Sequence, residues 1–191
     1  MPVPSAIAQC GGCIRQPPPL DACVAAVAYA YPWAGLIARF KFHNQPGHAV
    51  LLAAVLRHAP WAEPALDLAD RVLPMPLSTQ RLRERGFNQA LELARRLAPD
   101  KTDPGLLLRI RDTMPQSTLS RHERMHNVRH AFAVEPLRTA ELGGQRVVLV
   151  DDVMTSGASL YAAAMALRQG GVAHVTALVL ARAELGAASG S

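Results

Sequence analysis

The chain has 191 residues, half of them apolar, and carries a formal net charge of +5 at neutral pH. That length is sufficient for one α/β domain with a buried core and a small N-terminal appendage. No stretch approaches 18 uninterrupted apolar residues, which argues against a transmembrane span. The first residues lack the basic segment and sustained apolar core of a signal peptide, so we expect a cytoplasmic protein.

The appendage, residues 1–22, contains a glycine pair and three consecutive prolines and shows little periodicity. Cys10 and Cys13 form one C-x-x-C pair. A structural zinc site needs four ligands, usually from two such pairs, so the Zn²⁺ site is incomplete here. A redox role is not favoured either, because no βαβ unit surrounds the pair.

The segment at 23–58 shows first a strand pattern and then two helix patterns. Small and β-branched residues at 23–31 predict a strand, and the apolar spacing at 33–42 predicts a helix. A second helix is expected at about 48–58, ended by Pro60 and Pro64.

A basic turn follows the short strand expected at 71–73. Arg81, Arg83 and Arg85 crowd this turn, which leads into an amphipathic helix. If the strand lies beside the one at 147–150, these arginines face the acids that follow that strand, where at least one would contact a phosphate. The alternative is a solvated basic helix start, although arginine at a helix N-terminus opposes the helix dipole.

A long polar segment, 109–129, separates short strands expected at 106–108 and 131–134. A polar loop of this length is typical of a lid that excludes water from a site. It also contains an H-E-x-x-H sequence at 122–126, but the spacing of the following His does not fit the extended zinc-peptidase pattern.

The most informative stretch is 146–159. Four apolar β-formers lead into Asp151 and Asp152, and a loop then opens a helix near Ser159. The loop residues suit an anion, because hydroxyls, a flexible glycine and free helix N–H groups converge there: Thr155, Ser156, Gly157, Ala158 and Ser159. Two acids beside such a cradle imply a ligand that also carries hydroxyls or a divalent cation, and a ribose 5-phosphate fits. In the alternative interpretation the acids merely cap a helix or bind a neighbouring loop.

The remaining chain completes an alternating pattern, with a helix to Gln169, a strand at 174–181 and a tail at 184–191 that we expect to be disordered. We therefore predict one domain at 23–183, an open, mainly parallel sheet with helices on both faces. Ligands bind at the carboxyl ends of strands in such sheets. No G-x-G-x-x-G or G-K-S/T occurs, which excludes the usual nicotinamide and P-loop sites.

The stretch at 146–159 resembles the signature of the type I phosphoribosyltransferases. Longer stretches at 36–43, 72–90, 106–132 and 147–160 resemble the ComF (competence protein F) family of bacterial phosphoribosyltransferase-like proteins. Members usually carry further cysteine pairs upstream of the one at Cys10 and Cys13.

This resemblance implies binding of phosphoribosyl pyrophosphate (PRPP) with Mg²⁺. Asp151 and Asp152 would hold the ribose and the metal, and the loop at 155–159 would clamp the 5-phosphate. The residues expected to stabilise pyrophosphate are Arg81, Arg83, Arg85, Arg109 and Arg124.

The resemblance also implies a role in natural transformation, with single-stranded DNA and competence or helicase proteins as partners. No residue stands out as a general base, so the acceptor of a phosphoribosyl transfer stays open. The alternative is a non-catalytic PRPP-sensing scaffold that binds single-stranded DNA, although aromatic residues for base stacking make up only 5% of the chain.

Overall fold

The structure is a computed structural model that describes residues 14–15, 17–42, 47–111 and 130–183. Several residues singled out in the sequence lie outside these ranges: Cys10, Cys13, Arg124, most of the segment 109–129, and the tail 184–191. No helix in the described part of the chain is both long and apolar enough to cross a membrane.

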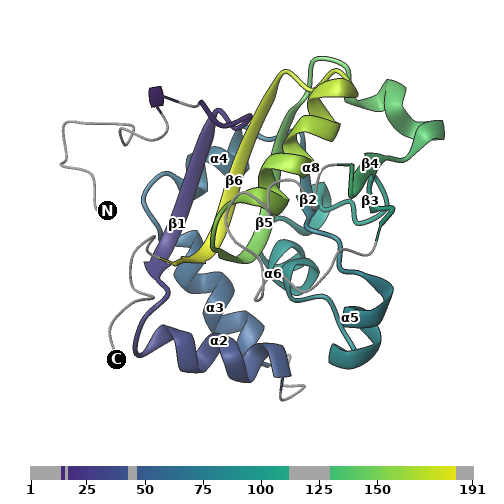
Figure 1. Cartoon of the computed structure of the whole chain (residues 1–191). Helices are drawn as coiled ribbons and strands as arrows, with labels where there is room; N and C mark the ends of the chain where they lie inside the picture. The colour runs from purple at the N-terminus through teal and green to yellow at the C-terminus, as the bar shows by residue number, and fades with distance from the viewer. Residues whose placement is uncertain (1–13, 16, 43–46, 112–129, 184–191) are drawn as a thin grey trace.

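A four-stranded sheet forms the centre of the fold (Figure 1). Its order is β1-β6-β5-β2, from β1 (Ala22–Ala28), β6 (His174–Arg182), β5 (Arg146–Met154) and β2 (Arg71–Pro74). Every neighbouring pair is parallel. The carboxyl ends of all four strands therefore meet at one edge of the sheet, as the sequence predicts.

Helices cover both faces of this sheet because β5 and β6 carry apolar residues on both sides. One face packs against α2 (Trp33–Phe42), α3 (His48–Arg57), α4 (Ala62–Asp67) and α6 (Gln89–Leu97). The other packs against α8 (Ala158–Gln169). Figure 1 shows α8 in front of the strands and α3 and α4 behind them. The predicted fold class is confirmed.

A small antiparallel pair stands beside the main sheet on the α8 side. It consists of β3 (Leu107–Arg109) and β4 (Phe132–Val134). Two 3-10 helices, Pro99–Lys101 and Pro136–Leu142, precede and follow it in the chain. The pair places Arg109 within reach of the carboxyl edge of the sheet.

Two local expectations were wrong. The basic turn is a helix, α5 (Thr79–Arg85), because Ser78 caps its start by accepting from the Arg81 backbone N–H at 3.2 Å. Arg83 and Arg85 occupy the last turn, where cations are favourable, so the argument from the helix dipole does not apply to them. Pro64 does not end a helix but lies in the first turn of α4, where its missing N–H has no intrahelical partner to lose.

Strand β5 is longer than expected and includes Asp151, Asp152 and Met154. The connection to α8 is reduced to three residues, Thr155 to Gly157. A short connection fixes the acids and the start of α8 relative to one another.

The end of the N-terminal appendage packs against the domain. Leu20 is buried in the core beneath α8. The carboxylate of Asp21 accepts from the Val175 backbone N–H at 2.6 Å and pairs with Arg168 of α8.

Candidate functional site

A cavity of about 360 Å³ opens at the carboxyl end of β5. This volume lies within the range of small-molecule sites, about 300–1,000 Å³. Its lining brings together β5, the connection to α8, the α5 helix, the start of α6, the end of α2 and Arg109 of β3. These elements are far apart in the chain, and the parallel sheet is what gathers them.

The floor of the cavity begins with the connection between β5 and α8. Gly157 adopts φ +80°, and a Cβ there would lie 2.6 Å from the Met154 side chain, so only glycine fits without a shift. Ser156 is buried, and its hydroxyl accepts weakly from the Ala158 backbone N–H at 3.4 Å. Gly157 offers no side-chain cap, so the first N–H groups of α8 remain suited to an anion.

The two acids of β5 point to different faces of the sheet, because side chains alternate along a strand. Val148 and Val150 pack beneath the helices α2, α3 and α6, and Asp152 continues that face. Asp151 continues the face of Leu149, which lies beneath α8. Both acids nevertheless line the cavity, since it spans the end of the strand.

Asp151 is perturbed by its surroundings. Burial and the neighbouring Asp152 carboxylate raise the pKa of Asp151 to about 7, against the opposing effects of Lys41, the Asp152 backbone N–H and Arg85. That N–H donates to Asp151 Oδ1 at 2.9 Å. Two adjacent carboxylates that repel each other in a partly buried site favour a cationic or hydroxyl-bearing ligand.

Lys41 faces these acids from the last turn of α2. Its Nζ lies 3.0 Å from Asp152 Oδ1, and the two side chains are only 16% and 9% exposed. No local sequence pattern around Lys41 indicates this contact.

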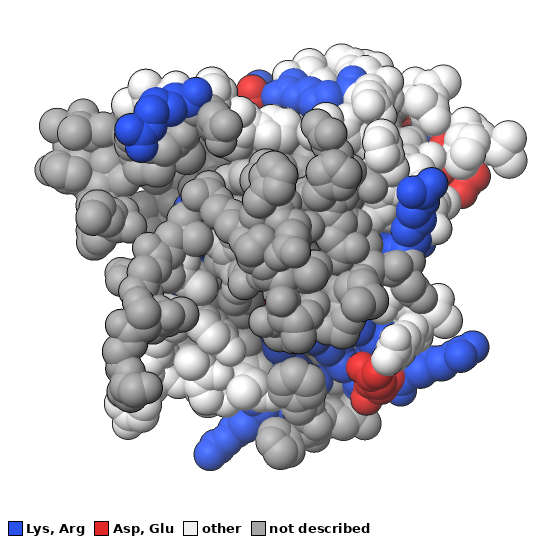
Figure 2. All heavy atoms as spheres, in the orientation of Figure 1, with Lys and Arg blue, Asp and Glu red and all other residues white. Residues whose placement is uncertain are grey.

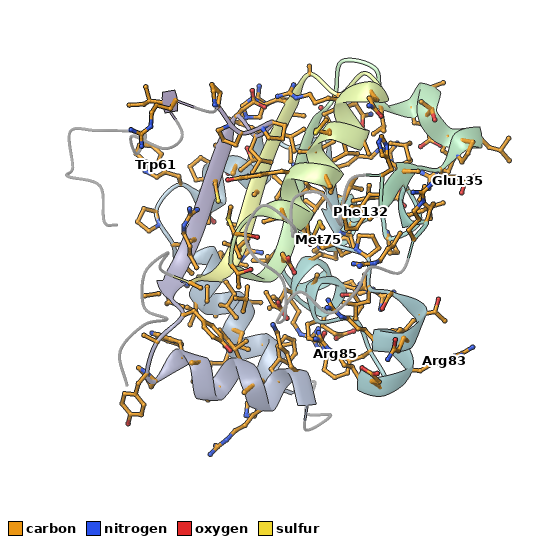
Figure 3. All side chains as sticks on the ribbon, in the orientation of Figure 1. Trp61, Met75, Arg83, Arg85, Phe132 and Glu135 are labelled. Atoms are coloured by element: carbon orange, nitrogen blue, oxygen red, sulfur yellow. The ribbon has the colours of Figure 1, made fainter. Side chains whose placement is uncertain are left out.

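Arginines form the opposite wall. Arg81 and Arg85 of α5 and Arg109 of β3 line the cavity, whereas exposed Arg83 does not. In Figure 3, Arg85 lies on the side of α5 that faces the sheet and Arg83 points outward. Figure 2 shows basic side chains gathering at the lower right of the molecule, where Figure 1 places α5. Among the described residues, four cationic and two acidic side chains line the cavity, which suits a polyanionic ligand: Lys41, Arg81, Arg85, Arg109, Asp151 and Asp152.

Asn88 and Gln89 support the arginine wall, a function that was not predicted from the sequence. Asn88 caps α6 through the Ala90 N–H at 2.9 Å and donates to the Met75 carbonyl at 3.0 Å, which ties α6 to the end of β2. Gln89 is 1% exposed, and its Oε1 accepts from Arg85 Nη1 at 2.9 Å. Arg85 is therefore held in place by a rigid helix. Their only sequence signal is their place in the stretch at 72–90, which resembles the competence protein F family.

A metal ion at this site would need additional ligating atoms from a bound ligand. Within the described residues no three His, Cys, Asp or Glu side chains converge to hold an ion. Asp151 and Asp152 supply carboxylate oxygens, and Mg²⁺ characteristically combines one or two carboxylates with substrate phosphates and waters. The donor set therefore fits a Mg²⁺ that is shared with a phosphorylated ligand.

Comparison with known proteins agrees with this architecture. The model of the phosphoribosyl transferase domain family matches residues 82–188, more than half of the chain. The chain is 36% identical over 181 residues to competence protein F of Haemophilus influenzae, covering 91% of this chain and 78% of that protein. It is 33% identical over 180 residues to the DNA utilization protein YhgH of Escherichia coli K12, covering 91% and 77%.

A solved structure, the allosteric regulatory enzyme of purine biosynthesis, aligns with a TM-score of 0.46 at 18% identity, over 74% of this chain and 29% of that chain. On the family match and the two relatives, the chain belongs to the phosphoribosyl transferase domain family and, within it, to the competence protein F family. The resemblance expected from the sequence is confirmed.

Proposed function

We propose that this protein binds PRPP with Mg²⁺ in the cavity at the end of β5 and acts as a phosphoribosyltransferase-type protein in the uptake or use of DNA. The observation that carries the proposal is the cavity itself. It places an anion cradle, two carboxylates and an arginine wall around a space of about 360 Å³. A ribose with phosphate at one end and pyrophosphate at the other needs these three surfaces.

Each surface has a chemical task. The backbone N–H groups and hydroxyls at 155–159 bind the 5-phosphate, and Asp151 and Asp152 accept from the ring hydroxyls. Arg81, Arg85 and Arg109 stabilise the charge that develops on the departing pyrophosphate. When bound, Mg²⁺ would neutralise part of that charge. Catalysis of this kind rests on positioning and electrostatics, and it requires no covalent bond to the protein.

The role in DNA handling is supported by the names of two relatives, a competence protein and a DNA utilization protein. Contact with single-stranded DNA and with competence proteins, and a cytoplasmic location, stay predictions. No histidine lines the cavity among the described residues, so the acceptor is open.

The proposal is tested by calorimetric titration of the protein with PRPP in the presence of Mg²⁺. Absence of binding to the wild type would refute it. Arg85→Gln should weaken PRPP binding by about tenfold to a hundredfold, since a charge-assisted hydrogen bond contributes about 1.5–3 kcal/mol. Arg83→Gln removes the same charge from the same helix outside the cavity, so its affinity should stay within about twofold of wild type.

A second candidate function is a non-catalytic scaffold that senses PRPP and binds single-stranded DNA. It is favoured by exposed Arg83, which adds to the basic side chains outside the cavity. Pyrophosphate release distinguishes the two. If PRPP binds but no nucleobase, amine or ammonia releases pyrophosphate, the scaffold is favoured. DNA binding through phosphates must then weaken steeply with salt.

A further inference from the structure

The ion pair between Lys41 and Asp152 places a protein cation on a carboxylate that the proposed function assigns to the ribose and metal. The Nζ to Oδ1 distance is 3.0 Å, and both side chains are largely shielded from water. Both residues line the cavity. The pair therefore belongs to the site and is not a solvated surface contact.

Lys41 is held there by a well-packed helix. Ile37 and Phe40 of α2 are fully buried against the sheet, and the Phe40 ring packs against Phe87 with centroids 5.5 Å apart. A lysine in the last turn of a helix is also favoured by the helix dipole. The ammonium consequently stays near the carboxylate when the cavity holds no ligand.

This arrangement creates a competition. A divalent cation that binds the same carboxylate would lie within a few ångströms of the ammonium, and like charges at that distance repel strongly in a partly buried site. Free metal therefore has to displace Lys41 from Asp152, and the loss of that ion pair opposes its binding. A metal that binds together with a polyanion does not face this opposition, because the oxygens of the anion can accept hydrogen bonds from the displaced ammonium.

We propose that Lys41 is a built-in counter-ion of Asp152 that keeps free divalent cations out of the site and yields the carboxylate only to a cation accompanied by an anionic ligand. The identity of that ligand rests on the proposed function, whereas the exclusion of free metal does not. Lys41 is thus a positioning residue that makes metal binding depend on ligand binding.

The first experiment measures thermal unfolding with and without millimolar Mg²⁺ and no other ligand. Lys41→Met leaves the buried Asp152 carboxylate without its ion-pair partner. The Tm of this variant should therefore fall by roughly 5–10 °C without metal. Mg²⁺ should restore most of that loss, because it replaces the missing cation. Wild type should shift by less than about 1 °C on addition of Mg²⁺, since Lys41 already occupies Asp152.

Two controls isolate the pair. Arg39→Met removes a positive charge from the same helix at an exposed position, and should behave like wild type. The double variant Lys41→Met/Asp152→Asn lacks the Asp152 carboxylate that Lys41 neutralises, and should lose the response to Mg²⁺. An equal response of wild type and Lys41→Met to metal would overturn the proposal, and so would a folded Lys41→Met that does not respond.

Lys41→Gln provides a second route if Lys41→Met does not fold, because its amide still donates to Asp152. Its affinity for Mn²⁺ alone, measured by electron paramagnetic resonance, should be about tenfold or more tighter than that of wild type. Equal affinities would refute the exclusion of free metal. Failure of PRPP to bind wild type would overturn the proposed function and leave these metal measurements intact.

Discussion

Replacement of Gly157 by alanine tests whether the turn between β5 and α8 has the geometry that an anion cradle needs. Gly157 adopts φ +80°, and an added Cβ would lie 2.6 Å from Met154 Cε and 2.8 Å from Tyr161 Cζ. A left-handed backbone costs alanine about 1–2 kcal/mol. Overpacking adds about 1–3 kcal/mol, because Met154 is itself only 2% exposed and has little room to move.

The expected loss of stability is therefore about 2–5 kcal/mol, which corresponds to a decrease in Tm of roughly 5–15 °C for a chain of this size. Urea unfolding monitored by circular dichroism measures the loss directly. Gly144→Ala is the matched control, because its φ is +73° and its Cβ would meet nothing within 4 Å. It should show the backbone penalty alone, about 1–2 kcal/mol.

Ligand binding provides the second measurement. The clash must move the first turn of α8, so Gly157→Ala should weaken binding of inorganic phosphate by about tenfold or more, while Gly144→Ala leaves it unchanged. Equal destabilisation by the two substitutions would show that steric crowding at Gly157 adds nothing to the backbone penalty. Unchanged phosphate affinity in a folded Gly157→Ala would show that the turn does not bind the anion.

Two further predictions concern charge. The pKa of Asp151 is raised from 3.8 to about 7 in the folded protein, so the protonated carboxyl favours the native state. This contribution is fully present below about pH 4 and is lost as the pH rises through 7. The unfolding free energy of wild type should therefore decline between about pH 4 and 7, and Asp151→Asn should flatten that decline. A parallel decline in both proteins would contradict the raised pKa of Asp151. Asp103 behaves in the opposite way, because hydrogen bonds from Arg138 at 2.6 and 3.1 Å lower the pKa of Asp103 below 3.8. Asp103→Asn should lower the unfolding free energy by about 1 kcal/mol near pH 7, measured by urea unfolding. The difference from wild type should shrink as the pH falls below about 4. A difference that stays constant with pH would count against the ion pair between Asp103 and Arg138.

The sequence by itself determined the fold class and the floor of the site. An apolar run that ends in Asp151 and Asp152, followed by a turn with Gly157 and a helix, is a local pattern, and local patterns specify a strand, a turn and a helix start in order. The alternation of strands and helices then required a parallel sheet with its carboxyl ends at one edge. The stretches that carry the family resemblance contain most of the residues that line the cavity, although they do not show what each residue does.

Only the tertiary structure decided which side chains meet across the cavity. The Lys41 contact with Asp152 joins α2 to β5, and no local pattern in either segment signals it. The direction of Arg85 towards the sheet and of Arg83 away from it depends on α5 being a helix capped by Ser78, where the sequence suggested a loop. The raised pKa of Asp151 likewise comes from burial and from Asp152, both of which depend on packing. The local sequence thus determined the strands and helices. The charges that face a ligand were determined by contacts between distant elements, because such contacts exist only once the sheet has assembled.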